Sequence, residues 1–296
     1  MLKIGIVGGA KKYHGMTFSQ MLNGYDRENA VKLNWSAIRN AQAEGATAAC
    51  IWDEDPADAK EVAEICNIPE IASHYEDMIG SVDGVIIVDD CSMQHQKKAI
   101  PFLKAGIPVF IDKPLSTDYK EAQAIVDCAA KSNALMMSTS VLRFAREAEA
   151  ARKNPEKWYT GMSMCKESMG NFIFYGIHSL ELMHSIIGPG IKSVRNVGRK
   201  GEDIIAVKWN NGRTFMVAAS ENIMGGFEIT LFGKTASEFI KVVDFDYAYS
   251  TALNEFIKMI KTGKAPFAPT STLEVIKAGC LAMKSLEDAS QEYFLD

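Results

Sequence analysis

The sequence predicts an α/β protein, with an N-terminal doubly wound parallel sheet followed by a C-terminal α+β domain that has a mainly antiparallel open sheet. Three observations support this prediction. Short apolar runs alternate with helical patterns in the first half, glycines follow the first run directly, and hairpin signals mark the second half. The pattern changes near residue 140, so we expect two domains, 1–140 and 141–296.

The first half contains apolar runs that are continuous rather than alternating, which is typical of strands buried on both faces. We expect strands at Leu2–Val7, Thr47–Trp52, Val82–Val88, Ile107–Ile111 and Ala134–Ser138. The segments between them carry amphipathic patterns, and we expect helices at Met16–Leu22, Pro56–Cys66, Gln94–Ala105 and Thr117–Lys131. A repeated strand, helix and strand order implies parallel pairing with right-handed crossovers.

The second half contains a helical pattern at Tyr175–Ile187 and then several short strand-like segments. We expect strands at Ser193–Val197, Asp203–Trp209, Thr214–Ser220 and Glu228–Phe232, and closing helices at Tyr249–Lys261 and Thr272–Leu286. The turn Asn210-Asn211-Gly212 is a hairpin signal, so we expect antiparallel neighbours here.

The composition limits the possible classes of function. The chain has 296 residues, 47% of them hydrophobic, and a net charge of −5, so no basic surface for nucleic acid is expected. No signal peptide and no apolar run of about 18 residues is visible. The six cysteines are scattered and no metal-binding spacing occurs. We expect a cytoplasmic protein with no metal, no nucleic-acid partner and no membrane partner.

The glycine turn is the first candidate site. Gly8, Gly9 and Ala10 follow the first strand, and Gly15 lies close to the start of the next helix. Glycines at this point let the backbone approach a pyrophosphate, whose charge then meets the amides of a helix N-terminus. The spacing departs from Gly-x-Gly-x-x-Gly, and a simple tight turn remains an alternative for this segment alone.

Asp53 strengthens the dinucleotide interpretation. It follows the second strand directly, where a carboxylate can accept hydrogen bonds from the ribose hydroxyls of a Rossmann-bound cofactor. Glu54 and Asp55 add negative charge and no Arg follows, so a 2′-phosphate would be repelled and NAD is favoured over NADP. The alternative is that Asp53 is the N-cap of the helix near Pro56. The sequence assigns no function to the long polar connection 23–45.

Lys113 is the next candidate because Asp112-Lys113-Pro114 ends another strand of the sheet. Ligands of open parallel sheets gather beyond the carboxyl ends of the strands. A lysine there can hydrogen-bond a substrate hydroxyl, and desolvation would favour its neutral amine. Pro114 makes a cis peptide bond possible. The alternative is a solvated turn lysine.

His178 and Glu181 lie three residues apart on one face of the expected Tyr175–Ile187 helix. Because His178 and His184 are six residues apart, they do not have the spacing of a metal-binding pair. On their own, His178 and Glu181 could be a satisfied polar pair in the core.

Taken in order, these motifs resemble the Gfo/Idh/MocA family of oxidoreductases over nearly the whole chain. The segments that carry the resemblance are the glycine turn, Asp53, Val88–His95, Asp112-Lys113-Pro114, Arg143-Phe144, Phe174–Glu181 and Phe256…Gly263-Lys264-Ala265-Pro266. The resemblance implies an NAD(P)-dependent dehydrogenase of a sugar, polyol or related small molecule, with hydride passing between a substrate carbinol carbon and the cofactor.

The resemblance also implies roles for individual residues. Lys113 and His178 would be catalytic, with Lys113 helping to move the proton of the substrate hydroxyl and His178 as its partner acid/base. Residues implied to contact the cofactor are Gly8, Gly9, Ala10, Gly15, Asp53, Asp90, His95, Asp112, Lys113 and Pro114. Residues implied to contact the substrate are Lys113, Arg143, Tyr175, His178 and Glu181.

Two departures from the family pattern leave a second function open. Phe174 stands where many members have an aspartate, and Asp90 and Cys91 replace the usual Thr and Pro. The alternative is therefore a non-catalytic dinucleotide sensor or regulatory protein on the same fold. Because the second sheet is expected to leave an apolar face open, a homodimer or homotetramer is also expected.

Overall fold

The computed structural model describes residues 1–89, 92–166 and 171–295. Contacts between Cα atoms divide the chain into two compact units. The first comprises Met1–Ser116, Lys120–Ser138 and Tyr249–Pro269, and the second comprises Thr117–Tyr119, Thr139–Ala248 and Thr270–Asp296. The sequence led us to expect a single division after residue 140. The units interleave instead, because one helix of the C-terminal third packs within the first unit.

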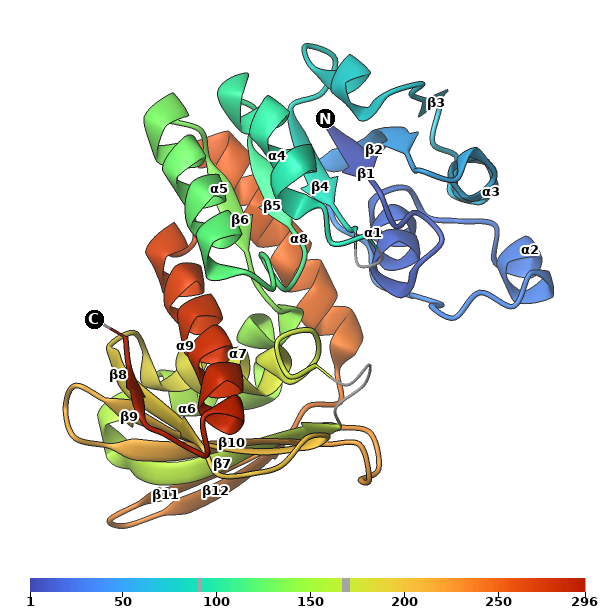
Figure 1. Ribbon diagram of the computed structural model, residues 1–296. Helices are drawn as coiled ribbons and strands as arrows, with labels where there is room; N and C mark the ends of the chain where they lie inside the picture. The colour runs from blue at the N-terminus through green and yellow to red at the C-terminus, as the bar shows by residue number, and fades with distance from the viewer. Residues whose placement is uncertain (90–91, 167–170, 296) are drawn as a thin grey trace. The chain divides into compact units, whose positions relative to one another are not determined.

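The first unit is built on a six-stranded, fully parallel sheet (Figure 1). Its strands are β1 (Leu2–Val7), β2 (Ala46–Trp52), β3 (Glu70–Ile71), β4 (Gly84–Ile87), β5 (Val109–Ile111) and β6 (Met136–Ser138). The spatial order β3-β2-β1-β4-β5-β6 reverses direction between β1 and β4, the switch point at which Rossmann folds bind dinucleotides. The predicted Rossmann sheet is confirmed, and the short edge strand β3 is an addition.

Helices cover both faces of this sheet (Figure 1). They are α1 (Tyr13–Asn23), α3 (Pro56–Ile65), α4 (His95–Lys104), α5 (Tyr119–Ser132) and α8 (Phe245–Thr262). The short helix α2 (Arg27–Lys32) packs on α3. Phe18 of α1 and Phe256 of α8 both contact Phe110 of β5, with ring centroids 5.5 and 5.8 Å apart, so α1 and α8 share one face. Helices α4 and α5 lie on the other face.

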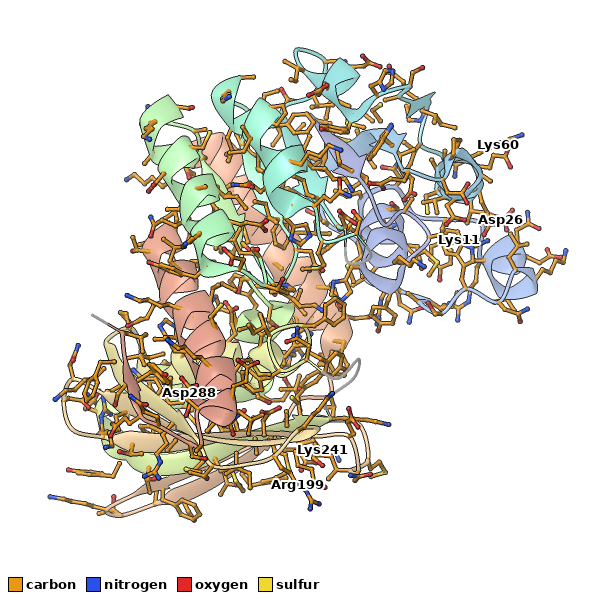
Figure 2. All side chains as sticks on the ribbon, viewed as in Figure 1. Lys11, Asp26, Lys60, Arg199, Lys241 and Asp288 are labelled. Atoms are coloured by element: carbon orange, nitrogen blue, oxygen red, sulfur yellow. The ribbon has the colours of Figure 1, made fainter. Side chains whose placement is uncertain are left out.

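The long connection 23–45 contains α2, which the sequence analysis did not assign. Asp26 caps this helix through its side chain. Trp35 Nε1 donates to Glu61 Oε1 of α3 at 2.9 Å, and Lys11 Nζ donates to Glu61 Oε2 at 2.7 Å. Figure 2 marks Lys11 and Asp26 on this part of the surface. Trp35 thus links the insertion to α3 through Glu61, and the Asp26 amide also donates to the Ile65 carbonyl oxygen of α3 at 2.8 Å.

The second unit is built on a seven-stranded sheet that is mostly antiparallel. Its strands are β7 (Trp158–Lys166), β8 (Ile191–Asn196), β9 (Glu202–Trp209), β10 (Thr214–Ser220), β11 (Phe227–Gly233), β12 (Ser237–Lys241) and β13 (Tyr293–Phe294), in the order β12-β11-β7-β10-β9-β8-β13. The predicted hairpin joins β9 to β10, with Gly212 at φ +82°. The sequence analysis did not assign β7, β12 or β13. Strand β7 pairs with distant β10 in parallel and with β11 antiparallel.

The inner face of this sheet is covered by α7 (Ile177–Ile187), which packs on β7, β10 and β11. Helix α9 (Pro269–Glu287) packs beside it, and His184 Nε2 of α7 lies 2.8 Å from Glu274 Oε2 of α9. The short segments η2 (Val141–Phe144), η3 (Arg146–Ala148), α6 (Glu149–Arg152) and η4 (Pro155–Lys157) lead from β6 into β7. In the described part of the chain, no helix combines the length and apolarity needed to cross a membrane.

Candidate active site

The glycine turn between β1 and α1 has the backbone form that the sequence predicts. Gly8 and Gly9 have φ angles of +73° and +54°, which side chains strongly disfavour. Helix α1 begins at Tyr13, three residues earlier than expected, so the connection between β1 and α1 is shorter than the sequence predicts. The reason is that Gly15 lies inside the first turn of α1 and does not open the helix.

Gly15 lets the helix start pack onto the turn. A Cβ at Gly15 would come 2.2 Å from the Gly9 carbonyl oxygen and 2.6 Å from that of Ala10. At Gly8, a Cβ would come 3.1 Å from both Asp89 Cβ and Lys98 Nζ. Only glycine fits at Gly15, and side-chain atoms crowd Gly8. This close backbone approach at a helix N-terminus fits the pyrophosphate of a dinucleotide.

Asp53 lies directly beside this turn. Its Oδ2 accepts a hydrogen bond from the Ala10 amide at 2.6 Å, and its Oδ1 accepts from the Asp55 amide at 2.8 Å. Burial raises the pKa of Asp53, and these two amide bonds only partly counteract the effect. The N-cap of α3 is Asp55, whose side chain accepts from the Ala57 amide. The N-cap alternative for Asp53 is therefore wrong, and its carboxylate faces the glycine turn.

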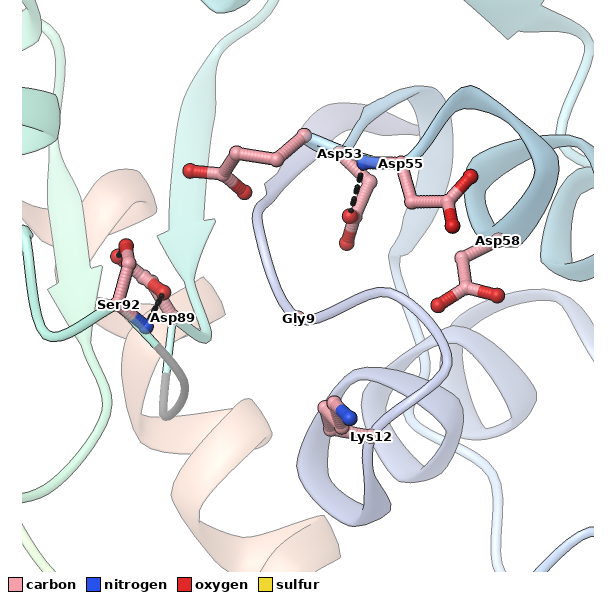
Figure 3. Close-up of a pocket in the computed structure, with 8 residues that line it drawn as sticks. Gly9, Lys12, Asp53, Asp55, Asp58, Asp89 and Ser92 are labelled. Atoms are coloured by element: carbon pink, nitrogen blue, oxygen red, sulfur yellow. Dashed lines mark hydrogen bonds between the residues drawn. The ribbon is translucent and has the colours of Figure 1, made fainter.

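A pocket of about 250 Å³ opens between the turn and the ends of β2 and β4 (Figure 3). It is lined by Gly9, Lys12, Asp53, Glu54, Asp55, Asp58, Asp89 and Ser92. Figure 3 shows Asp53, Asp55 and Asp58 on one side, Asp89 and Ser92 on the other, and Lys12 below the turn. The predominance of carboxylates suits ribose hydroxyls and opposes an additional phosphate.

Lys98 supplies a buried cation at the edge of this pocket. Only 1% of its side chain is exposed, and Nζ lies 2.6 Å from Asp89 Oδ2. Glu54, a half-exposed residue after β2, also contacts Nζ. Burial opposes ionisation of Asp89, but hydrogen bonds from Lys98 and Ser92 outweigh it and lower its pKa to about 2. An ion-paired cluster thus spans the gap from the end of β2 to α4.

The turn after β5 holds Lys113 in a buried position. Lys113 is only 5% exposed, so the solvated-lysine alternative is wrong. The Lys113–Pro114 peptide bond is cis. His95, at the start of α4, is fully buried, and its Nδ1 lies 2.9 Å from the Pro114 carbonyl oxygen and 3.3 Å from that of Leu115. His95 therefore fixes the backbone of the turn that carries Lys113.

His14 lies beside the same turn. Its Nδ1 is 2.5 Å from Asp112 Oδ2, and both residues are buried. Burial opposes ionisation of Asp112, but His14 and then Lys113 hold its pKa below the ordinary value. The ring of Tyr249 from α8 packs edge-on against His14, with centroids 5.5 Å apart. Asp112 thus has a protein partner, and its contact with a cofactor remains a prediction.

In the second unit, His178 is buried in the first turn of α7. Its Nδ1 lies 2.6 Å from the hydroxyl oxygen of Ser140. The rings of Tyr175 and Phe227 pack against the imidazole at centroid distances of 5.2 and 5.1 Å. Because α7 begins at Ile177, Tyr175 lies in the turn before the helix, not on it as the sequence analysis expected. These contacts fix the plane of the imidazole ring.

Glu181 has partners other than His178. Its Oε1 accepts from the Thr139 hydroxyl at 2.5 Å and from Arg143 Nε at 3.0 Å, and Arg143 Nη2 lies 2.9 Å away. The predicted substrate-binding residues Arg143 and Glu181 therefore form a buried ion pair. Their contact with a substrate remains a prediction.

The structure brings the predicted residues together in three groups. One is the turn after β5, with Asp112, Lys113, Pro114 and the adjacent His95. Gly8, Gly9, Ala10, Gly15 and Asp53 surround one turn, while His178, Tyr175, Arg143 and Glu181 share the start of α7. Asp90 lies outside the described residues. Among the residues that are described, no group of three or more His, Cys, Asp or Glu side chains is arranged to hold a metal ion.

Sequence reasoning missed Lys98, Asp89, His14 and Ser140. One signal was available for Lys98, since it stands three residues after His95 and four before Phe102, within the stripe that α4 buries. A charged residue in an apolar stripe implies a buried partner. No local signal marks Ser140 or His14, because their partners are 38 and 98 residues away in the chain.

Comparison with known proteins agrees with this geometry. Residues 2–140 match the model of the Gfo/Idh/MocA oxidoreductase family, described as an NAD-binding Rossmann fold. No curated protein sequence matches the chain.

Solved structures match the whole chain. A myo-inositol 2-dehydrogenase from Lactobacillus plantarum is 15% identical, with a TM-score of 0.83 over 100% of this chain and 99% of that one. A myo-inositol dehydrogenase from Lactobacillus casei, in complex with NAD(H) and myo-inositol, is 13% identical, with a TM-score of 0.82 and coverage of 100% and 97%. A scyllo-inositol dehydrogenase from Lactobacillus casei with bound NAD(H) and scyllo-inositol is 15% identical, with a TM-score of 0.79 and coverage of 99% of each chain.

At these identities the structural likeness establishes the fold. The family match, the strand order and the glycine turn agree on the nature of the first unit. Residues 2–140 form an NAD-binding Rossmann domain that matches the model of the Gfo/Idh/MocA family of oxidoreductases.

Proposed function

We propose that this protein is an NAD-dependent dehydrogenase that oxidises a CH–OH group of a sugar or polyol, or reduces the corresponding carbonyl. The observation that carries the proposal is the burial of Lys113 at the carboxyl end of β5, on a dinucleotide-binding sheet. Burial holds this residue at the edge where open parallel sheets bind their ligands, and a lysine amine there can accept a proton from a substrate hydroxyl.

The proposed roles of the protein's residues are as follows. The glycine turn and Asp53 hold the cofactor through its pyrophosphate and ribose. NAD⁺ held by these residues would supply the acceptor for the hydride of the carbinol carbon. Lys113 takes the proton of the substrate hydroxyl, and we propose His178 as its catalytic partner. The C–H electron pair leaves as hydride, the O–H pair forms the C=O bond, and the proton moves to the Lys113 amine.

The substrate class we propose is a cyclic polyol such as an inositol. Two of the structural neighbours are dehydrogenases crystallised with an inositol and NAD(H). Their sequence identity to this chain is low, so inositols are the first compounds to test rather than an assignment.

The test is a spectrophotometric assay of NADH formation with inositols, other polyols and sugars. We expect turnover on at least one of them. Lys113→Ala should lower kcat by about 10²–10⁴-fold. The matched control is Lys60→Ala, an exposed lysine on α3 that Figure 2 labels, and it should leave kcat unchanged.

The sensor alternative predicts a different result. Calorimetry would then show NAD binding without turnover on any compound of the panel, and the dehydrogenase proposal would be wrong. Unchanged kcat in both Lys113→Ala and His178→Ala would remove the assignment of these two residues while leaving the activity.

We also propose a homodimer or homotetramer that forms through the outer face of the second sheet. The register places four exposed apolar side chains on that one face, namely Met162, Ile204, Phe232 and Phe239. Light scattering tests this proposal, since Phe239→Lys should shift the mass toward that of a monomer. With an NAD-dependent activity and free cysteines at the five described positions, we propose a cytoplasmic location.

A further inference from the structure

The hydroxyl group of Ser140 is a hydrogen-bond partner of His178 Nδ1. Ser140 is fully buried and is the N-cap residue of η2. Its oxygen accepts a hydrogen bond from the Leu142 amide at 3.2 Å and lies 2.6 Å from His178 Nδ1. A serine hydroxyl has one proton to donate and two lone pairs to accept with.

The direction of the Ser140–His178 hydrogen bond follows from these partners. The amide of Leu142 can only donate, so it uses a lone pair of the Ser140 oxygen. Within residues 1–89, 92–166 and 171–295, His178 Nδ1 is the one remaining partner of that hydroxyl. If Nδ1–H donated, the hydroxyl proton would be buried without an acceptor, which carries a full desolvation cost. The hydroxyl therefore donates to an unprotonated Nδ1.

The carboxylate nearest to His178 on α7 does not change this assignment. A carboxylate at Nδ1 would accept a proton there and favour the opposite tautomer. Glu181 lies one turn further along, but Thr139 and Arg143 already occupy its Oε1. Phe174, four residues before His178, carries no carboxylate. Ser140, which can donate, is thus the group that meets Nδ1.

We propose that Ser140 is a positioning residue that locks neutral His178 in the Nε2–H tautomer, so that His178 presents a hydrogen-bond donor and not a proton-accepting base. The catalytic consequence rests on the proposed dehydrogenase function. His178 then donates Nε2–H to the substrate and does not itself accept the hydroxyl proton during oxidation. The tautomer itself does not depend on any activity.

The first experiment measures the tautomer directly by ¹⁵N–¹H NMR of the full-length protein at alkaline pH, where an ordinary imidazole is neutral. The chain has five histidines, and His178→Gln identifies the signal of interest. We expect an unprotonated Nδ1 and a protonated Nε2 in the wild-type protein. A protonated Nδ1 in that spectrum overturns the proposal, and this result needs no variant at Ser140.

The second experiment uses Ser140→Ala, with Ser140→Thr as the variant that keeps a hydroxyl. We expect the alanine variant to show a mixture of the two tautomers and the threonine variant to restore the wild-type pattern. An unchanged Nε2–H pattern in Ser140→Ala would show that another group fixes the tautomer and would overturn the role of Ser140.

The third experiment separates a donor from a base by kinetics. The side-chain amide nitrogen of Gln can replace Nε2–H, whereas that of Asn reaches the position of Nδ1. We expect His178→Gln to keep kcat within about 10-fold of wild type, and His178→Asn to lose about 100-fold or more, as for a lost donor at a developing charge. Equal losses in the two variants would contradict a donor role. Absence of turnover in the wild type would overturn the proposed function, while the NMR result would still decide the tautomer.

Discussion

Each unit has a buried ion pair beside its candidate functional residues, and the two pairs differ in their third partner. In the first unit, Lys98 and Asp89 are each 1% exposed, and half-exposed Glu54 joins them from the pocket side. In the second unit, Arg143 and Glu181 are completed by the neutral hydroxyl of Thr139.

Because of this difference, the two ion-pair clusters have different effects on the residues around them. The first cluster has two carboxylates for one ammonium, so it leaves negative charge at the mouth of the dinucleotide pocket. That charge can discriminate between cofactors. In the second cluster one carboxylate, Glu181, meets one guanidinium, Arg143, and the nearby His178 is hydrogen-bonded to the hydroxyl of Ser140.

The largest expected effect is on the pair in the first unit. Lys98→Met would leave Asp89 buried without its cation, so we expect the free energy of unfolding to fall by about 3–5 kcal/mol. Urea denaturation followed by circular dichroism measures this change. The control is the double variant Asp89→Asn/Lys98→Met, which removes both charges and should recover most of the loss.

Arg143→Met makes the matching change in the second unit. Arg143 is 12% exposed, and Thr139 remains as a partner of Glu181. We therefore expect the free energy of unfolding to fall by an amount at the lower end of the range given for Lys98→Met. A larger loss for Arg143→Met than for Lys98→Met would reverse the comparison between the two clusters.

The second effect is a pH dependence of stability. The pKa of Asp89 is lowered from 3.8 to about 2, so its pairing stabilises the folded state above pH 4 and is lost as the pH falls toward 2. This lowering of the Asp89 pKa corresponds to about 2 kcal/mol of folding stability. Wild type should therefore lose about this much more stability than Asp89→Asn/Lys98→Met between pH 6 and pH 2.5. Parallel stability curves for the two proteins would contradict the low pKa of Asp89.

The smallest effect concerns the choice of cofactor. Asp53→Asn removes a charged acceptor from the pocket, so we expect NAD⁺ affinity to fall about 10-fold and the preference over NADP⁺ to narrow. Glu54→Gln should narrow the preference for NAD⁺ over NADP⁺ less, because Lys98 already compensates part of the Glu54 charge. Calorimetric titration with both cofactors measures this, with the exposed Glu64→Gln as control. An unchanged preference in Asp53→Asn would exclude Asp53 from cofactor selection.

Much of the first unit could be predicted because its signals are local. Continuous apolar runs give the strands, and each polar residue after a run lies at the carboxyl edge of the sheet, as Asp53 and Lys113 do. The second unit was predicted less completely. Strand β7 pairs with β10 and β11, more than 40 residues further along the chain, and alternation alone did not reveal it.

The sequence by itself determined the Rossmann sheet, the glycine turn, the acid after β2 and the lysine after β5, because parallel strands bring consecutive chain segments to one edge. The tertiary structure decided the partners. Lys98 meets Glu54, His14 meets Asp112 and Ser140 meets His178. Such pairs depend on which side chains are buried together, since a buried polar group must find its partner wherever the fold places one. The sequence could therefore name His178 as a candidate, while the fold assigned its proton.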